Sequence, residues 1–306
     1  MENKNVQPEK YQAMKLVCEE FESLNNQEYA DLILSTVRLL LEATNSLHKE
    51  NVPLPSWMQL VEPVIFKLCF QTSSLLRLYH GTVLPYQRDS KDVIVFDEPT
   101  VNTLFRSLLE NYLTNFYLFI EGVSEAEKEF RVTVWKFSGA KQRVEFEVKE
   151  QIAIAKRKSE MKVVESLQQI IEDSPFFLAF KKDERKKVLS GVKPRLFNSW
   201  TDLIKRSNLR VSWYKNMYGF HSNYSHSEFI SILQFNDGQF GHHPNNTKGH
   251  YLLMIIHSLI GKTIVDLASA FPSISKYIFG LDKTIRFRIE YLAELSSNGS
   301  TEYHPD

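Results

Sequence analysis

Hydrophobic residues recur at every third or fourth position along most of the chain, the spacing that places them on one face of an α-helix. This pattern predicts helices over about 8–24, 28–48, 56–79, 99–122, 209–224, 247–270 and 282–295. Between 81 and 98 there is only one short apolar run, 93–96, which fits a lone strand or an extended connection. These patterns together predict an all-α, multi-helix bundle with little or no sheet.

The middle of the chain predicts one long helical arm. Ser124, followed three residues later by Glu127, is typical of a capping box that begins a helix. From 144 to 171, hydrophobic residues at spacings of mostly three and four alternate with Lys, Arg and Glu. We therefore expect a long, two-sided surface helix that continues the one begun at Ser124, with a kink at Ser138 and Gly139, and that protrudes from the bundle.

The sequence contains no internal repeat, low-complexity tract or Ser/Pro-rich linker. We therefore predict a single helical domain over 1–306. It would consist of N-terminal helices in 8–80, a motif helix with the long arm in 99–175, and C-terminal helices in 195–297.

The net charge of the protein bears on whether it can bind nucleic acid. The 306 residues include 37 basic and 37 acidic side chains, so the formal net charge is zero. This balance removes any global electrostatic case for wrapping duplex nucleic acid, although a local basic patch is compatible with it. The stretch 181–187, KKDERKK, is such a local run, and it is interpreted as a solvated connection or, alternatively, as a patch that contacts phosphate.

Cysteine content and hydropathy suggest a cytoplasmic protein. Cys18 and Cys69 lie in apolar helical patterns without a C-x-x-C spacing, which favours reduced thiols over a disulfide. The N-terminus has no apolar segment typical of a signal peptide. The apolar run 112–120 is interrupted by Thr114 and Asn115 and is too short to span a bilayer, so no membrane partner is expected.

Four common catalytic motifs are absent from the sequence. It contains no G-x-x-x-x-G-K-[ST], G-x-G-x-x-G, G-x-S-x-G or H-E-x-x-H. Phosphate-cradling loops, nucleophile elbows and zinc-protease helices are therefore unsupported.

Arg106 and Glu110 form the first candidate constellation. They lie one helical turn apart, at the edge of an apolar arc in FRSLLENYLTNFYLF. One interpretation is an intrahelical ion pair at the surface, worth about 0.3–0.5 kcal/mol. The other is a ligand site in which Arg106 binds an anion and Glu110 orients it.

The second candidate is the segment 210–229, RVSWYKNMYGFHSNYSHSEF. Trp213, Met217, Phe220 and Tyr224 share one helical face and are expected to be core. Tyr214, Tyr218 and His221 flank this face, and Ser222, Ser225 and His226 lie near the helix end. With Tyr224 and Ser227, the segment gathers two histidines, three tyrosines and three serines. These groups either satisfy one another around a helix end or form a site for hydrogen bonding and proton transfer. We predict that Arg106 and Glu110 lie within side-chain reach of 218–226.

The combination of these motifs resembles a group of uncharacterised bacterial all-helical proteins. That group carries R-x-x-x-E on one helix and Y-x-x-x-S-x-Y-x-H-S about a hundred residues later. Here the matching residues are Arg106, Glu110, Tyr218, Ser222, Tyr224, His226 and Ser227. The resemblance covers the middle and C-terminal thirds, and it implies a bundle in which the two motif helices face each other across a polar pocket. It does not supply a reaction.

The same segment is more distantly similar to HEPN-type ribonucleases, which are bundles of four to five helices. Their Arg, polar residue and His correspond to Lys215, Asn216 and His221 in this sequence. The resemblance implies metal-independent RNA cleavage in stress or phage defence, with His221 as general acid or base and His226 nearby. Lys215 stands where the family has Arg, which loses planar bidentate phosphate binding and puts catalysis in doubt.

Histidines are also crowded in the C-terminal part. Six of the nine lie within 37 residues, at His221, His226, His242, His243, His250 and His257. No H-x-x-x-H pair occurs among them, so we expect no metal and no other cofactor.

Two functions remain open. The protein is either a HEPN-like ribonuclease or a non-catalytic binding module whose Arg106, Glu110, Tyr218 and His226 hold a nucleotide, a small ligand or a partner protein. RNA or a nucleotide is the expected partner, and a homodimer is compatible with either function. A His221 beside a basic cleft would favour the ribonuclease, whereas a buried His221 would favour the binding module.

Overall fold

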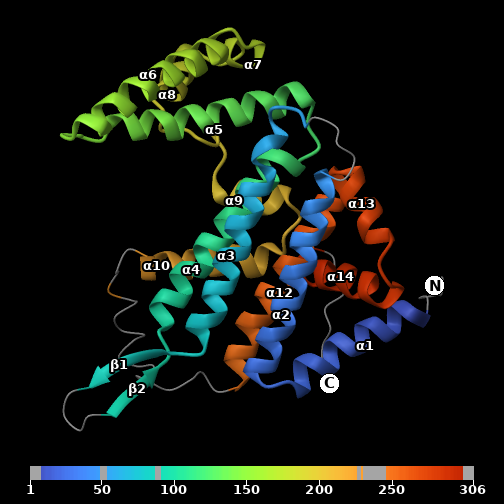
Figure 1. Ribbon diagram of the computed structural model, residues 1–306. Coiled ribbons are helices and arrows are strands. Elements are labelled where there is room, and N and C mark those ends of the chain that lie inside the picture. Colours follow the sequence, from blue (N-terminus) through green and yellow to red (C-terminus); the bar gives the residue numbers. More distant parts are fainter. Residues whose placement is uncertain (1–7, 49–53, 87–90, 226–228, 230–245, 299–306) are drawn as a thin grey trace. The chain divides into compact units, whose positions relative to one another are not determined.

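The structure is a computed structural model that describes residues 8–48, 54–86, 91–225, 229 and 246–298, with the backbone alone for 84–86, 91–95, 225 and 246–250. Helices make up most of the described chain, which confirms the predicted all-α class (Figure 1). Contacts divide the chain into two compact units. One comprises Met1–Val52, Val61–Asn115 and Ile204–Asp306, and the other comprises Pro53–Leu60 and Phe116–Leu203. The single domain stays a prediction, because contact clustering does not measure whether the units unfold together.

Eight of the α-helices in the described part of the chain, and both strands, belong to the first unit. The helices are α1 (Pro8–Ser23), α2 (Asn26–Asn45), α3 (Val61–Tyr79), α4 (Glu98–Asn115), α10 (Val211–Ser225), α12 (Asn246–Ala270), α13 (Pro272–Phe279) and α14 (Lys283–Ser296). A short 3₁₀ turn, Ser46–His48, follows α2. The helices predicted in this unit therefore exist, with ends displaced by a few residues.

Helix α12 lies at the centre of this unit, packed against α2, α13 and α14. Within the described chain, its segment Tyr251–Ala270 is long and apolar enough by composition to cross a membrane, although no such segment was expected from the sequence. About two-thirds of its most apolar stretch is buried inside the protein, as in the core helix of a bundle. Buried Ile256, Leu259 and Ile260 contribute to this core.

A small antiparallel hairpin replaces the expected lone strand. β1 (Thr82–Tyr86) pairs with β2 (Lys91–Val95), with Thr82 opposite Val95 and Tyr86 opposite Lys91. The sequence suggested only the second strand, because Pro85 in the first strand cannot donate a ladder hydrogen bond and argues against a strand. Such a proline is tolerated here because each strand of a two-stranded sheet has a free edge.

The second unit is also helical among its described residues. It contains a 3₁₀ turn (Met58–Leu60), a π-helical turn (Phe116–Ile120), α5 (Glu125–Glu145), α6 (Gln151–Glu172), α7 (Pro175–Leu178), α8 (Lys182–Leu189) and most of α9 (Trp200–Arg206). The predicted start at Ser124 is confirmed, because its side chain accepts a hydrogen bond from the Glu127 amide at 3.2 Å. The segment 181–187, expected to be a solvated connection or a patch that contacts phosphate, forms most of the two-turn helix α8, and most of its residues are exposed.

The predicted single long helix with a kink at Ser138 and Gly139 is wrong. The chain instead turns back at 146–150, and α5 and α6 pack against each other as a helical hairpin (Figure 1). Ser138 lies inside α5, where its hydroxyl donates to the carbonyl of Gly191. The helix continues through Gly139 because packing against α6 stabilises it and outweighs the low helix propensity of glycine.

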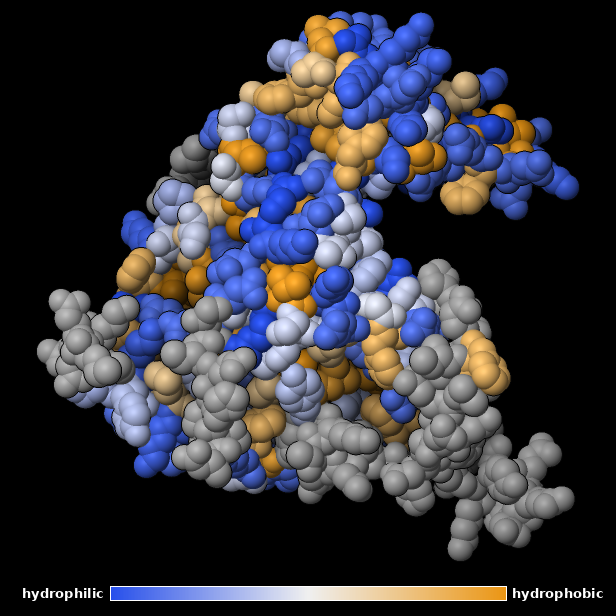
Figure 2. Space-filling model, turned by 180° about the vertical axis from the view of Figure 1, so that it is seen from behind, coloured by the Kyte–Doolittle hydropathy of each residue, from blue (hydrophilic) through white to orange (hydrophobic). Residues whose placement is uncertain are grey.

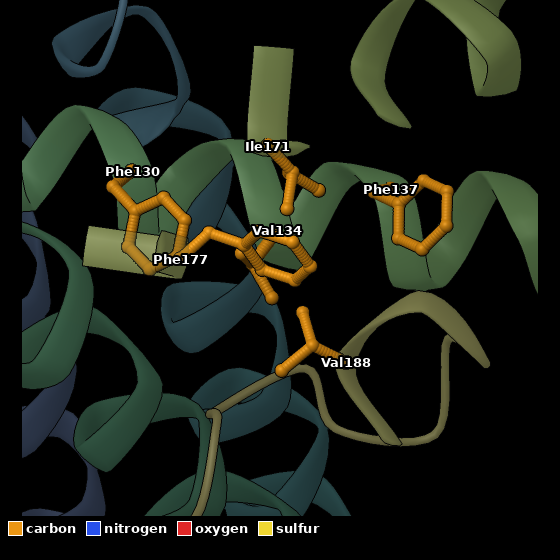
Figure 3. Packing of buried hydrophobic residues seen from close by; sticks show 6 residues of the cluster. All are labelled: Phe130, Val134, Phe137, Ile171, Phe177 and Val188. Carbon is orange, nitrogen blue, oxygen red and sulfur yellow. The ribbon is translucent and has the colours of Figure 1, made fainter. Parts of the chain in front are cut away.

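A compact apolar cluster holds this hairpin to the short helices after it. Figure 3 shows its six buried side chains gathered between α5, α6, α7 and α8; they are Phe130, Val134, Phe137, Ile171, Phe177 and Val188. On the outer surface of α6, Ile152, Val163 and Ile170 are exposed. Figure 2 shows hydrophobic and hydrophilic side chains intermixed on this unit.

Arg131 of α5 forms hydrogen bonds and ion pairs that connect α5 to the π-helical turn. Its guanidinium is buried, donates to the carbonyl of Tyr117 at 2.9 Å, and pairs with Glu121 and Glu127. Two carboxylates and a carbonyl compensate for taking this charge out of water. The π-helical turn is therefore held in place by an ion-pair network within the second unit.

Candidate functional site

Helices α4 and α10 of the first unit cross each other and bring the two sequence motifs together (Figure 1). On α4, Arg106 Nε donates to Glu110 Oε1 at 3.1 Å, so the intrahelical ion pair is present. The side chains are 18% and 29% exposed, which leaves both partly accessible to solvent.

Helix α10 supplies hydroxyl groups for both charges of this pair. Arg106 Nη1 donates to Ser222 Oγ and Nη2 donates to the Tyr218 hydroxyl, each at 3.1 Å. The Tyr218 hydroxyl donates in turn to Glu110 Oε1, also at 3.1 Å. The predicted proximity is therefore confirmed for Tyr218 and Ser222, whereas His226 lies outside the described residues. We call these four residues, Arg106, Glu110, Tyr218 and Ser222, the Arg106 cluster.

The electrostatics of the Arg106 cluster keep its hydrogen bonds in place. Burial acts to lower the pKa of Arg106, but the hydrogen bond from its guanidinium to Tyr218 and the Glu110 charge raise it overall, so the guanidinium stays charged. Burial and the Glu110 charge raise the pKa of Tyr218, so its hydroxyl keeps the proton that it donates. Arg106 also lies 5.0 Å from the centre of the Tyr218 ring, a cation–π distance.

Tyr224 makes a second tether between the same helices. Its ring is buried, and its hydroxyl donates to Glu98 Oε1 at 3.2 Å. Burial, with the Glu98 charge, raises the pKa of Tyr224 well above its ordinary value. This residue was predicted to bind ligand together with the Arg106 cluster, but the structure joins it to the other end of α4.

His221 lies in the interior between the two tethers. It is buried against the ring of Phe105, with 5.0 Å between ring centres, and burial lowers its pKa to about 4. Lys215 and Asn216 are exposed on a different side of α10. The structure therefore does not bring the three residues expected from the ribonuclease resemblance into one site.

The inward face of α10 matches the predicted one at Tyr224 and differs from it elsewhere. Tyr214, His221 and Tyr224 point into the protein, whereas Phe220 is 39% exposed and Trp213 and Met217 are only partly buried. Because aromatic residues occur on both sides of α10, hydrophobicity alone does not select a face. Hydroxyl groups that match the charged side chains of α4, together with the fit of His221 against its interior surface, fix the rotation instead.

The histidine crowding does not produce a metal site among the described residues, where no three His, Cys, Asp or Glu side chains converge. His257 is buried in α12; its Nε2 lies 2.9 Å from the Thr36 hydroxyl and its Nδ1 lies 3.3 Å from the Tyr29 hydroxyl. His226, His242 and His243 lie outside the described residues, and only the backbone of His250 is described.

One buried charge cluster escaped the sequence analysis. Lys262 and Asp266, one turn apart on α12, form a buried ion pair, and the Tyr112 hydroxyl donates to Asp266 Oδ2 at 2.7 Å. Burial raises the pKa of Asp266, opposed by Lys262. The sequence did contain a signal for this ion pair, because Lys262 and Asp266 are two opposite charges four residues apart within a largely apolar helical pattern.

Comparison with family models, with curated proteins and with solved structures found no match.

Proposed function

We propose that this protein is a non-catalytic binding module and that the Arg106 cluster binds a small phosphate-bearing ligand, such as a nucleotide. The observation that carries the proposal is the partly exposed guanidinium of Arg106, held in one orientation by contacts with Glu110, Tyr218 and Ser222. A planar donor that is already oriented loses little conformational entropy when it binds a phosphate.

The other members of the cluster suit such a ligand. A phosphate on Arg106 would replace one of its neutral hydroxyl partners, Ser222 or Tyr218, with a charged acceptor, and hydrogen bonds of this kind are the stronger ones. Glu110, 29% exposed, is an acceptor for a ribose hydroxyl or a base amino group. The Arg106 guanidinium as donor and the Glu110 carboxylate as acceptor, held side by side, are why we propose a nucleotide as the ligand.

The buried His221 favours binding over ribonuclease chemistry. A general base must come within hydrogen-bond reach of a substrate hydroxyl, and His221 is enclosed by the protein. Its lowered pKa follows from the same burial. Lys215 and Asn216, exposed elsewhere on α10, offer no phosphate contact beside it.

Calorimetric titration with AMP, ADP, ATP and inorganic phosphate tests the proposal. We expect binding of at least one nucleotide by the wild type and at least about tenfold weaker binding by Arg106→Lys, which keeps the charge but not the planar fork. Arg38→Gln is the matched control, because this arginine is exposed on α2. Circular dichroism of each variant establishes that it is folded.

Three results would contradict the proposal. The first is the absence of binding for all four ligands, and the second is equal binding by wild type and Arg106→Lys. The third is RNA cleavage in EDTA that His221→Ala abolishes, which would restore the ribonuclease hypothesis.

A further inference from the structure

One side of α10 carries aromatic residues that remain partly exposed to solvent. Arg210 lies over the face of Trp213, with 4.1 Å from its Cζ to the ring centre. Trp213 meets Tyr251 of α12 edge to face, with ring centres 5.7 Å apart. Further along α10, Asn216 and Phe220 follow at helical spacing on the same side. We call Arg210, Trp213, Asn216, Phe220 and Tyr251 the aromatic face.

Part of this face is accessible: Trp213 is partly buried, whereas Phe220 and Tyr251 are more exposed than aromatic side chains usually are. Tyr251 is 43% exposed and Phe220 is 39% exposed, and Asn216 is exposed between the two aromatic residues of α10. Exposed rings beside an arginine present flat apolar surfaces and a positive charge at the same place.

The segment that contains α10 is rich in basic residues. The stretch 203–227 contains Lys205, Arg206, Arg210 and Lys215 and no acidic residue. At the average acidic content of this chain, a segment of that length would carry about three. Asp202 and Glu228 flank this stretch, and Arg210 is the basic residue within it that lies over Trp213 on the aromatic face.

We propose that the aromatic face binds single-stranded nucleic acid. Bases stack on exposed aromatic rings whatever their sequence, while lysine and arginine pair with the backbone phosphates. A duplex hides the faces of its bases, so it cannot use the rings in this way. The few basic residues fit a short strand, and the neutral chain as a whole does not fit extensive duplex contacts.

This surface is separate from the proposed ligand site. Tyr218 and Ser222 contact α4, whereas Trp213, Asn216 and Phe220 lie on another side of α10. The two proposals therefore depend on different side chains and can fail independently.

Fluorescence anisotropy with labelled oligouridine and oligoadenine of about 15 nucleotides, and with a duplex of equal length, tests the proposal. We expect the single strands to bind more tightly than the duplex, and Trp213→Ala or Tyr251→Ala to weaken binding by about 5- to 150-fold. A plot of the logarithm of the binding constant against the logarithm of the salt concentration should be less steep for Arg210→Gln, with a slope smaller in magnitude by about one.

The controls separate binding from folding. Phe70→Ala and Lys67→Gln change an exposed aromatic and an exposed basic residue on α3 and should bind like wild type. If Trp213→Ala does not fold, Asn216→Asp adds a negative charge at an exposed position and should weaken binding at least about fivefold.

Three outcomes would overturn the proposal. They are no binding of single strands by the wild type, equal affinity for single strand and duplex, and unchanged binding in every folded variant of the aromatic face. Loss of binding in Arg106→Gln with none in Trp213→Ala would also overturn it, because the strand would then sit on the Arg106 cluster.

Discussion

The hydroxyl of Tyr218 lies 3.1 Å from Nη2 of Arg106, although 112 residues separate them in the sequence. The same hydroxyl donates to Glu110, so it connects both members of an ion pair on another helix. This phenol is therefore one of the contacts that set how α10 packs on α4, together with Ser222 and Tyr224.

Removing this hydroxyl should loosen α10 and couple to Arg106. We expect Tyr218→Phe to reduce the free energy of unfolding by about 1 kcal/mol, because the site is only partly buried and solvent weakens its hydrogen bonds. A double-mutant cycle of Tyr218→Phe and Arg106→Met, measured by urea denaturation, should give a coupling energy of at least about 0.5 kcal/mol. Tyr11→Phe, at an exposed tyrosine on α1, is the control. Strict additivity would show that the contact contributes nothing.

Acid should destabilise the first unit through its buried histidines. Burial lowers the pKa of His257 to about 3, against 6.5 for the free side chain. The unfolded chain therefore binds a proton below about pH 6.5 that the folded protein does not bind, and stability is lost as the pH falls from 6.5 toward 3. We expect a loss of about 2 kcal/mol from His257 alone at about pH 5.

Urea denaturation between about pH 7.5 and pH 5 measures this effect. His257→Gln should flatten the profile by the contribution of this residue, and His221, whose pKa burial lowers to about 4, should account for a further part. A wild-type profile that does not fall below pH 6.5 would contradict the prediction.

Gly261 lies where α12 and α14 pack closely against each other. A Cβ at this position would lie 2.5 Å from Leu292 Cβ and 3.3 Å from the carbonyl oxygen of Ile289. We expect Gly261→Ala to lower the free energy of unfolding by about 1–3 kcal/mol, because the two backbones must separate. Gly139→Ala, in a helix with open space around the glycine, should instead stabilise by up to about 1 kcal/mol. Thermal or chemical denaturation compares the two, and equal effects would rule out steric conflict.

The second unit should depend on the apolar cluster between α5, α6, α7 and α8. Phe137 is fully buried there, so Phe137→Ala should cost about 3–5 kcal/mol. Phe146→Ala, at an exposed residue just after α5, should change stability by less than about 0.5 kcal/mol. Hydrogen exchange should show the loss of protection in α5 to α8, and equal protection in both variants would contradict this assignment.

Local patterns in the sequence determined the helices and some of their ends. The 3.6-residue repeat depends only on neighbouring residues, and so does the Ser124 cap, so both were readable without tertiary structure. The same reasoning placed Arg106 and Glu110 on one edge of α4 and predicted that polar groups of 218–226 would meet them.

Only the tertiary structure decided which way each helix faces and where the chain turns back. Trp213 and Tyr214 are both aromatic, and the sequence favoured the first as core. In the structure the second is buried, and its hydroxyl lies 2.8 Å from the Ser296 hydroxyl of α14. The break at 146–150 and the burial of His221 likewise depend on contacts between residues far apart in the chain. Periodicity is a property of a segment, whereas the face that is buried depends on the surface it meets, and that surface exists only after folding.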